Sequence, residues 1–174
     1  MGITVTTSYV KDITDRFRYY KRQAERAMEQ IPDPAFFATL GPESNSIAVL
    51  IKHLSGNMRS RWTDFLTTDG EKPDRDYNAE FREPPKTRDE LMALWEAGWN
   101  CALNTLNSLT DEHLSHEVSI RSEAHSVMQA INRQVTHASY HVGQIVYLAK
   151  HFAGGNWKSL TASHGKPAGL HSSK

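Results

Sequence analysis

Four stretches of the chain carry apolar residues at every third or fourth position, and this periodicity constrains the fold more than any other feature. The stretches cover residues 8–31, 45–66, 87–109 and 126–152. Apolar residues at this spacing fall on one stripe of a helix, so each stretch is predicted to form an amphipathic α-helix. Four such helices can bury their stripes against one another, which predicts an all-α four-helix bundle.

Capping residues support the predicted helix boundaries. Ser8 is suited to the N-cap of the first helix, and Pro32 follows its last turn. Thr87 and Glu90 have the spacing of a capping box at the start of the third helix. A pair of glycines that begins with Gly154 is expected to end the fourth helix. The boundaries of these three helices therefore follow from local chemistry.

The segment between the second and third predicted helices, residues 67–86, is long and polar. It contains Pro73, Pro84 and Pro85 and many charged residues, so we expect a loop that crosses the outside of the fold. Such a loop favours a bundle with a long crossover connection over a plain up-down-up-down bundle, and its sequence leaves open whether it covers a site. Residues 114–125 are expected to form a short hairpin or an irregular excursion.

Length and charge exclude several classes of protein. The 174 residues fit one domain, 1–174, with a tail that is expected to be weakly ordered after about residue 166. With 20 Lys and Arg against 20 Asp and Glu, the chain has no net charge with which to bind nucleic acid or an anionic membrane surface. A lone cysteine, Cys101, excludes a disulfide-stapled scaffold, and no signal sequence or membrane-spanning run is evident. We therefore expect a cytoplasmic protein.

Three histidines lie where two of the predicted helices face a groove of the bundle. His137 and His141 are four residues apart in the fourth helix, so their side chains project from nearly the same angle. His53 has the same position relative to the apolar stripe of the second helix. Three imidazoles with open positions for water or substrate are typical of a catalytic metal site, and imidazole suits zinc, nickel, copper and iron. The alternative is that these histidines are hydrogen-bonded residues at the edge of the core.

Two further residues of the second helix are candidates for binding a substrate or cofactor. Asn57 lies beside His53, and Arg61 lies two turns beyond it. Arg61 either belongs to a solvated or salt-bridged face or holds a carboxylate of a thiol cofactor. Cys101 has no His or basic residue within one helical turn, so it is interpreted as a small core residue rather than a nucleophile. The Glu-x-x-His pattern of di-iron bundles is absent, which disfavours a ferritin-like protein.

Three motifs resemble those of the DinB/YfiT-like superfamily of four-helix bundles, and the resemblance covers nearly the whole chain. They are Ile51-Lys52-His53-Leu54-Ser55-Gly56-Asn57, Thr136-His137-Ala138-Ser139-Tyr140-His141-Val142-Gly143-Gln144-Ile145 and Gly155-Asn156-Trp157-Lys158-Ser159-Leu160. The resemblance is to a branch without an agreed activity. It implies that His53, His137 and His141 bind one divalent metal ion per chain, most often nickel or zinc, and that the chain forms a homodimer.

Characterised relatives in that superfamily include transferases and isomerases that use a low-molecular-weight thiol, such as bacillithiol, mycothiol or glutathione, and metal-dependent hydrolases. The resemblance therefore implies a metal-dependent enzyme with a small-molecule substrate and thiol-transferase or hydrolase chemistry. Two alternatives remain. In one, the metal is structural or absent and the bundle is a dimeric interaction module. In the other, the chain is a metal-sensing or stress-response binding protein without turnover.

Overall fold

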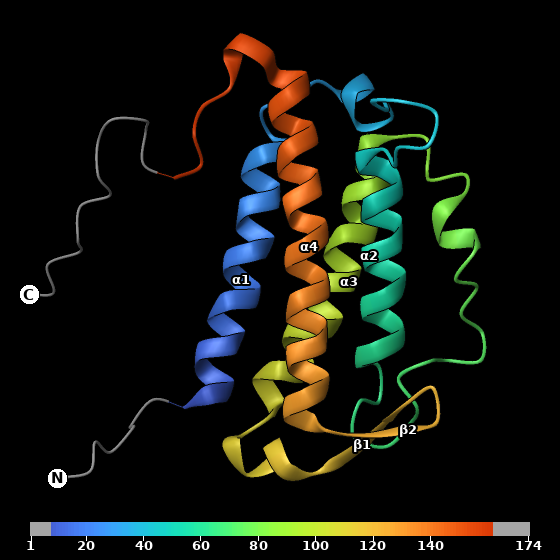
Figure 1. The fold of residues 1–174 in the computed structure, drawn as a ribbon, viewed down its shortest axis with the longest axis vertical. Helices are drawn as coiled ribbons and strands as arrows, with labels where there is room; N and C mark the ends of the chain where they lie inside the picture. Colours follow the sequence, from blue (N-terminus) through green and yellow to red (C-terminus); the bar gives the residue numbers. More distant parts are fainter. Residues whose placement is uncertain (1–7, 162–174) are drawn as a thin grey trace, which may run out of the picture.

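The four predicted helices are confirmed in a computed structural model, which describes residues 8–161 (Figure 1). They are α1 (Tyr9–Met28), α2 (Ile47–Trp62), α3 (Arg88–Ser108) and α4 (Val127–Ala153). The remaining helical pieces are short turns of 3-10 helix, and the predicted weakly ordered tail lies outside the described residues. The fold is therefore an all-α bundle, as the apolar periodicity predicts.

Two consecutive helices, α2 and α3, run in the same direction through the bundle (Figure 1). In Figure 1, α2 and α3 run downward, α1 and α4 run upward, and the connection from α2 to α3 returns along the outside of the bundle. The closest helix pairs are α2 with α3 and α1 with α4. Two neighbouring parallel helices need a long return path, so the expected crossover is a geometric requirement of this topology.

A small hairpin closes the end of the bundle where α4 begins. Strands β1 (Glu117–Ile120) and β2 (Glu123–Ser126) pair antiparallel, so the hairpin is the correct one of the two expectations for this segment. The carboxylate of Asp69 accepts hydrogen bonds from the backbone N–H groups of Arg121 and Ser122, at 2.9 and 2.7 Å. These bonds and one from Ser119 hold the pKa of Asp69 far below its usual value. Asp69 thus ties the start of the crossover to the hairpin turn.

The second helix is shorter than its apolar pattern predicts. It begins at Ile47, because the Ser46 side chain accepts a hydrogen bond from the Val49 N–H, and it ends at Trp62 rather than at residue 66. Asp64 has a φ of 48°, a left-handed conformation that ends the helix. Phe65 is nevertheless buried, and its ring lies 4.8 Å from that of Trp62. The apolar pattern therefore continues into the core after the helix has stopped.

Aromatic side chains fill the centre of the bundle. Phe17 of α1 packs edge-to-face on Trp62 and Trp99, with ring centroids 5.8 and 6.3 Å apart, and Trp95 packs on Trp99 at 5.3 Å. All four side chains are almost fully buried. Each such ring contributes roughly 1.5–3 kcal/mol of burial free energy, which makes this cluster a principal contact between α1, α2 and α3. No helix among the described residues is both long and apolar enough to span a bilayer.

Gly98 allows α2 and α3 to approach closely, and this contact can be tested. A Cβ atom at Gly98 would lie 2.7 Å from the Ser55 Cα, so Gly98→Ala is expected to lower the free energy of unfolding by about 1–3 kcal/mol through overpacking. Gly143→Ala is the matched control, because no heavy atom lies within 4 Å of its added Cβ. That variant should instead gain about 0.5–1 kcal/mol from helix propensity. Chemical denaturation of both variants checks the pair, and equal effects would contradict it.

Candidate metal centre

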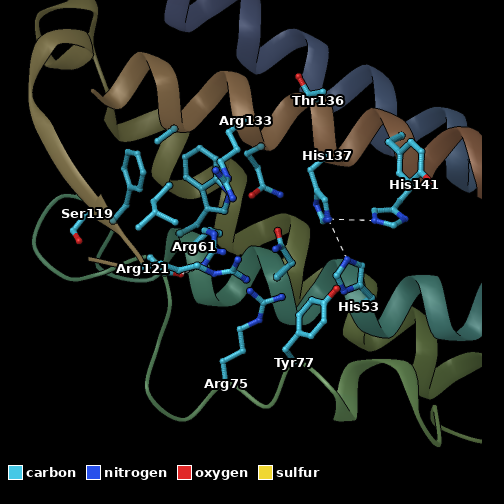
Figure 2. A pocket seen from close by; sticks show the side chains of 18 of the residues that line it. His53, Arg61, Arg75, Tyr77, Ser119, Arg121, Arg133, Thr136, His137 and His141 are labelled. Atoms are coloured by element: carbon cyan, nitrogen blue, oxygen red, sulfur yellow. Dashed lines mark hydrogen bonds between the residues drawn. The ribbon is translucent and has the colours of Figure 1, made fainter. Parts of the chain in front are cut away.

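The structure brings His53 of α2 together with His137 and His141 of α4. The Nε2 atom of His137 lies 3.1 Å from that of His53 and 3.2 Å from that of His141 (dashed lines in Figure 2). One ring nitrogen of each histidine lies within 4.8 Å of the other two. The sequence pattern places each histidine at the edge of the apolar stripe of its helix. The cluster of three side chains that it predicts is confirmed.

Two of the histidines make hydrogen bonds to residues outside the cluster. These bonds determine which ring nitrogen directs its lone pair toward the cluster. His53 Nδ1 donates to Glu80 Oε2 at 2.8 Å, and His141 Nδ1 donates to Gln144 Oε1 at 2.8 Å. Each neutral ring carries one proton, so the Nε2 atoms of His53 and His141 are both unprotonated. His137 Nε2 can donate a proton to only one of them. The cluster therefore has an excess of lone pairs, which is the donor set of a cation site.

Two of the three nitrogen separations also fit one ion. Ligand nitrogens at about 2.0–2.1 Å from a divalent metal lie about 2.9 Å apart at right angles and about 3.4 Å apart in a tetrahedron. The two short separations, 3.1 and 3.2 Å, fall between these limits. Among the described residues the buried Nδ1 of His137 has no hydrogen-bond partner. No hydrogen bond to a described residue outside the cluster therefore fixes the orientation of its ring. The three histidines could hold a metal ion.

Burial favours the neutral form of two of the three histidines, His137 and His141. His53 and His141 are 3% and 8% exposed, and His137 is half-buried. Burial, together with the neighbouring His141 and His53, lowers the pKa of His137 from 6.5 to about 3. Burial also lowers the pKa of His141, although the hydrogen bond with Gln144 acts in the opposite direction. Metals bind the neutral imidazole, so no proton has to leave His137 before an ion can bind.

Glu80 is the site residue that the sequence does not reveal. It lies in the 3-10 turn η2 (Ala79–Phe81) of the crossover, 27 residues after His53, and it is 6% exposed. Arg75 donates to both of its oxygens, at 2.7 and 2.8 Å. Burial favours the neutral acid, but the hydrogen bonds from Arg75 and His53 outweigh it and lower the pKa of Glu80. The acceptor of the hydrogen bond from His53 Nδ1 is therefore a charged carboxylate.

The only sequence signal for Glu80 is a glycine in the motif around His53. A Cβ atom at Gly56 would lie 2.8 Å from the Glu80 carboxyl carbon. The Glu80 carboxyl group thus packs directly on the backbone of α2, where any side chain would displace it. A glycine within a helix otherwise costs stability, which marks this position as one where another group approaches.

A cavity of about 540 Å³ opens beside the histidines. The crossover forms one wall of it: the Phe81 ring lies 4.5 Å from the His53 ring, and Tyr77 meets His53 edge-on at 6.0 Å (Figure 2). Tyr77 is 48% exposed, so the wall reaches solvent. The crossover therefore flanks the site rather than passing over the far side of the bundle.

Both residues predicted to bind a substrate or cofactor line this cavity, and both are buried. Asn57 and Arg61 are each 8% exposed. Arg61 donates to the carbonyl of Gly70 and to Glu71 Oε2, the latter at 2.9 Å, so it belongs to a salt-bridged rather than a solvated face. Cys101 is half-buried and is not among the residues that line the cavity.

The low pKa of His137 predicts how the metal-free protein responds to acid. An unfolded His137 titrates near 6.5 but the folded one near 3, so its contribution to stability is complete above pH 6.5 and is lost as the pH falls toward 3. Between pH 7 and pH 5 we expect the free energy of unfolding to fall by up to about 2 kcal/mol more in the wild type than in His137→Gln. Urea denaturation in the presence of a chelator checks this, and parallel pH profiles would contradict it.

Glu80→Gln tests the hydrogen bond behind His53. The amide keeps an acceptor for His53 Nδ1 but removes the charge and one of the two acceptors for Arg75, so metal affinity should fall about 10–100-fold. Gly56→Ala should have an effect of similar size, because it displaces the same carboxyl group. Gly143→Ala, which adds a Cβ in open space, is the control. Competition with a chromophoric zinc chelator measures all four proteins, and unchanged affinity in Glu80→Gln would show that Glu80 does not support the site.

Comparison with known proteins gives a fold and a family but no activity. No protein with a curated description matches the chain. One similar solved structure is titled "Crystal structure of the conserved protein of locus from Enterococcus faecalis", with a TM-score of 0.63 and 12% identity over 84% of this chain and 98% of that one. At this identity the similarity shows a shared fold. Residues 4–166 match the family described as "Protein of unknown function (DUF1572)". Since this match spans most of the sequence, the chain belongs to the DUF1572 family.

Proposed function

We propose that the chain is a metal-dependent enzyme that binds one divalent ion, zinc or nickel, through His53, His137 and His141. The observation that supports this most is the convergence of three Nε2 atoms at the wall of an open cavity. A structural site is usually closed by four protein ligands, whereas three ligands beside a cavity leave room for a reactant. The ion would supply Lewis acidity toward a thiol or a water molecule.

The protein's own residues prepare this site in two ways. Glu80 and Gln144 hold the rings of His53 and His141 with Nε2 toward the cluster, which removes the rotational freedom that ion binding would otherwise have to restrict. Phe81 and Tyr77 cover one side of His53 and limit the access of water to it. Glu80 is already engaged by Arg75 and His53, and no Asp or Glu is among the described residues that line the cavity, so we assign no carboxylate as a general base.

The resemblance to the DinB/YfiT-like superfamily favours two reactions. One is transfer to a low-molecular-weight thiol, and the other is hydrolysis of a small molecule. In both, the proposed role of Asn57 and Arg61 is to bind the substrate or the thiol, because both line the cavity next to the histidines. A homodimer and a cytoplasmic location also stay predictions.

The metal assignment is tested by metal content. Protein purified without an affinity tag is analysed by mass spectrometry, before and after reconstitution with zinc or nickel, beside His53→Ala and His137→Ala. His151→Ala is the matched control, since His151 is an exposed residue of α4 outside the cluster. We expect about one ion per chain in the wild type and in the control, and at least a tenfold loss of affinity in the other two variants.

A cobalt-substituted sample then separates an enzyme from a binding protein. An open site changes the visible spectrum of cobalt when a thiol is added, whereas a closed structural site does not. Stabilisation by metal without any response to thiols or substrate analogues would favour the interaction-module alternative. No metal in the reconstituted wild type would overturn the proposal.

A further inference from the structure

Apart from the histidines, every acidic or basic residue that lines the cavity is an arginine. The cavity contains Arg61, Arg75, Arg121 and Arg133, and no Asp or Glu is among the described residues that line it. The chain as a whole has 20 basic and 20 acidic residues, so an all-basic lining does not follow from composition. Clefts lined by one sign of charge concentrate ligands of the opposite sign.

The four arginines come from four separate parts of the fold. Arg61 belongs to α2, Arg75 to the crossover, Arg121 to the hairpin turn and Arg133 to α4. Figure 2 shows Arg61, Arg121 and Arg133 gathered on one side of the three histidines. The topology therefore collects positive charge at one end of the cavity and the histidines at the other.

Nearby carboxylates cancel only part of this charge, since Glu80 pairs with Arg75 and the remaining ion pairs all use Glu71. Glu71 pairs with Arg61, Arg75 and Arg121, at 2.9, 3.2 and 2.8 Å, and neither Glu71 nor Glu80 lines the cavity. Burial favours the neutral acid of Glu71, but hydrogen bonds from Arg121 and Arg61 lower its pKa to about 2. Two carboxylates, Glu71 and Glu80, thus pair with three guanidinium groups, and Arg133 remains outside these pairs.

Arg133 differs from the other three arginines. Among the described residues it makes no hydrogen bond or ion pair, although the other three are all held by Glu71. It is exposed and lies one helical turn before His137, on the cavity side of α4. An unpaired guanidinium in this position has all of its donors available to a ligand.

Buried polar atoms without partners support a polar ligand independently of charge. Asn57 Oδ1, Trp62 Nε1 and Gln134 Nε2 are buried and unpartnered within the described structure, and all three residues line the cavity. The three residues, Asn57, Trp62 and Gln134, are 8%, 2% and 5% exposed. A buried polar atom without a partner costs about 1–3 kcal/mol, so a lining with three of them is suited to a ligand that bonds to them.

We propose that the cavity takes a small organic substrate with an oxyanion, such as a carboxylate or sulfonate, at the end away from the histidines. This deepens the proposed function and rests on it, because the other end of the same molecule would lie at the metal. Arg133 and Arg61 bind the oxyanion, and Gln134 donates a further hydrogen bond. Guanidinium groups suit planar oxyanions because they offer two parallel N–H donors.

Helix geometry sets the length of such a molecule. Arg133 precedes His137 by four residues, which is about 6 Å along α4, and Arg61 follows His53 by eight residues, which is about 12 Å along α2. The guanidinium groups end long side chains, so they can close part of this distance. The substrate is thus expected to place its reactive group and its anionic group roughly 5–10 Å apart.

Matched thiols test the proposal on the cobalt-substituted full chain. The probes are 3-mercaptopropionate and 6-mercaptohexanoate, each beside its neutral carboxamide, so that only the charge of the far end changes. Titration followed by the cobalt spectrum gives each dissociation constant. We expect at least one carboxylate to bind about tenfold more tightly than its amide, the size of one charge-assisted hydrogen bond.

Arg133→Gln is the diagnostic variant, because the side chain makes no hydrogen bond or ion pair within the described structure that the fold would lose. It should reduce the preference for the carboxylate to about threefold or less, while Arg16→Gln, in an exposed arginine of α1, should leave it at about tenfold. Equal binding of the acid and the amide by the wild type would overturn the proposal. So would a preference that Arg133→Gln leaves unchanged.

A metal-free arm distinguishes this proposal from the proposed function. If no thiol alters the cobalt spectrum, the thiol-transfer form of the proposed function fails, and succinate is then titrated against succinamide into chelator-treated protein by calorimetry. Selective binding of succinate that Arg133→Gln weakens would uphold the anion site alone. Equal or absent binding would overturn it.

Discussion

The buried hydrogen bond between Glu80 and His53 is the contact on which the rest of the site depends. It joins the crossover to α2, and Arg75 neutralises the carboxylate through two more hydrogen bonds. A buried carboxylate without these partners would be strongly destabilising, so the three side chains are stable only as a set. The glycine at position 56 leaves the space in which this set meets the helix.

The path of the chain explains why a loop residue has this role. Because α2 and α3 run in the same direction, the chain must travel back along the bundle between them (Figure 1). That return path brings η2 against α2 next to His53, and Asp69 fastens its start to the hairpin. The cavity therefore has two walls of regular helix, which hold the histidines, and one wall of loop, which carries Arg75, Tyr77 and Phe81. The hairpin also lines it, through residues that include Arg121.

Periodicity predicts the part of the site that lies on helices. His53, His137 and His141 can be identified because a helix fixes the direction of each side chain from its position in the sequence. Glu80 cannot, since a loop has no repeating geometry and the contact spans 27 residues. Net charge is also uninformative, because a sum over the chain hides four arginines that the fold collects in one place. The end of α2 is predicted too late because the buried Phe65 extends the apolar pattern past the last helical turn.

The separation of the histidines along the chain has a consequence for folding. His53 and its partner Glu80 are separated by 27 residues, so α2 and the crossover can form their part of the site without α4. His137 lies 84 residues from His53 and joins only when α4 docks against α2. The donor set is thus completed only by a long-range contact between α2 and α4. An ion that binds the complete set would stabilise the closed bundle and is expected to slow its opening more than it speeds its assembly.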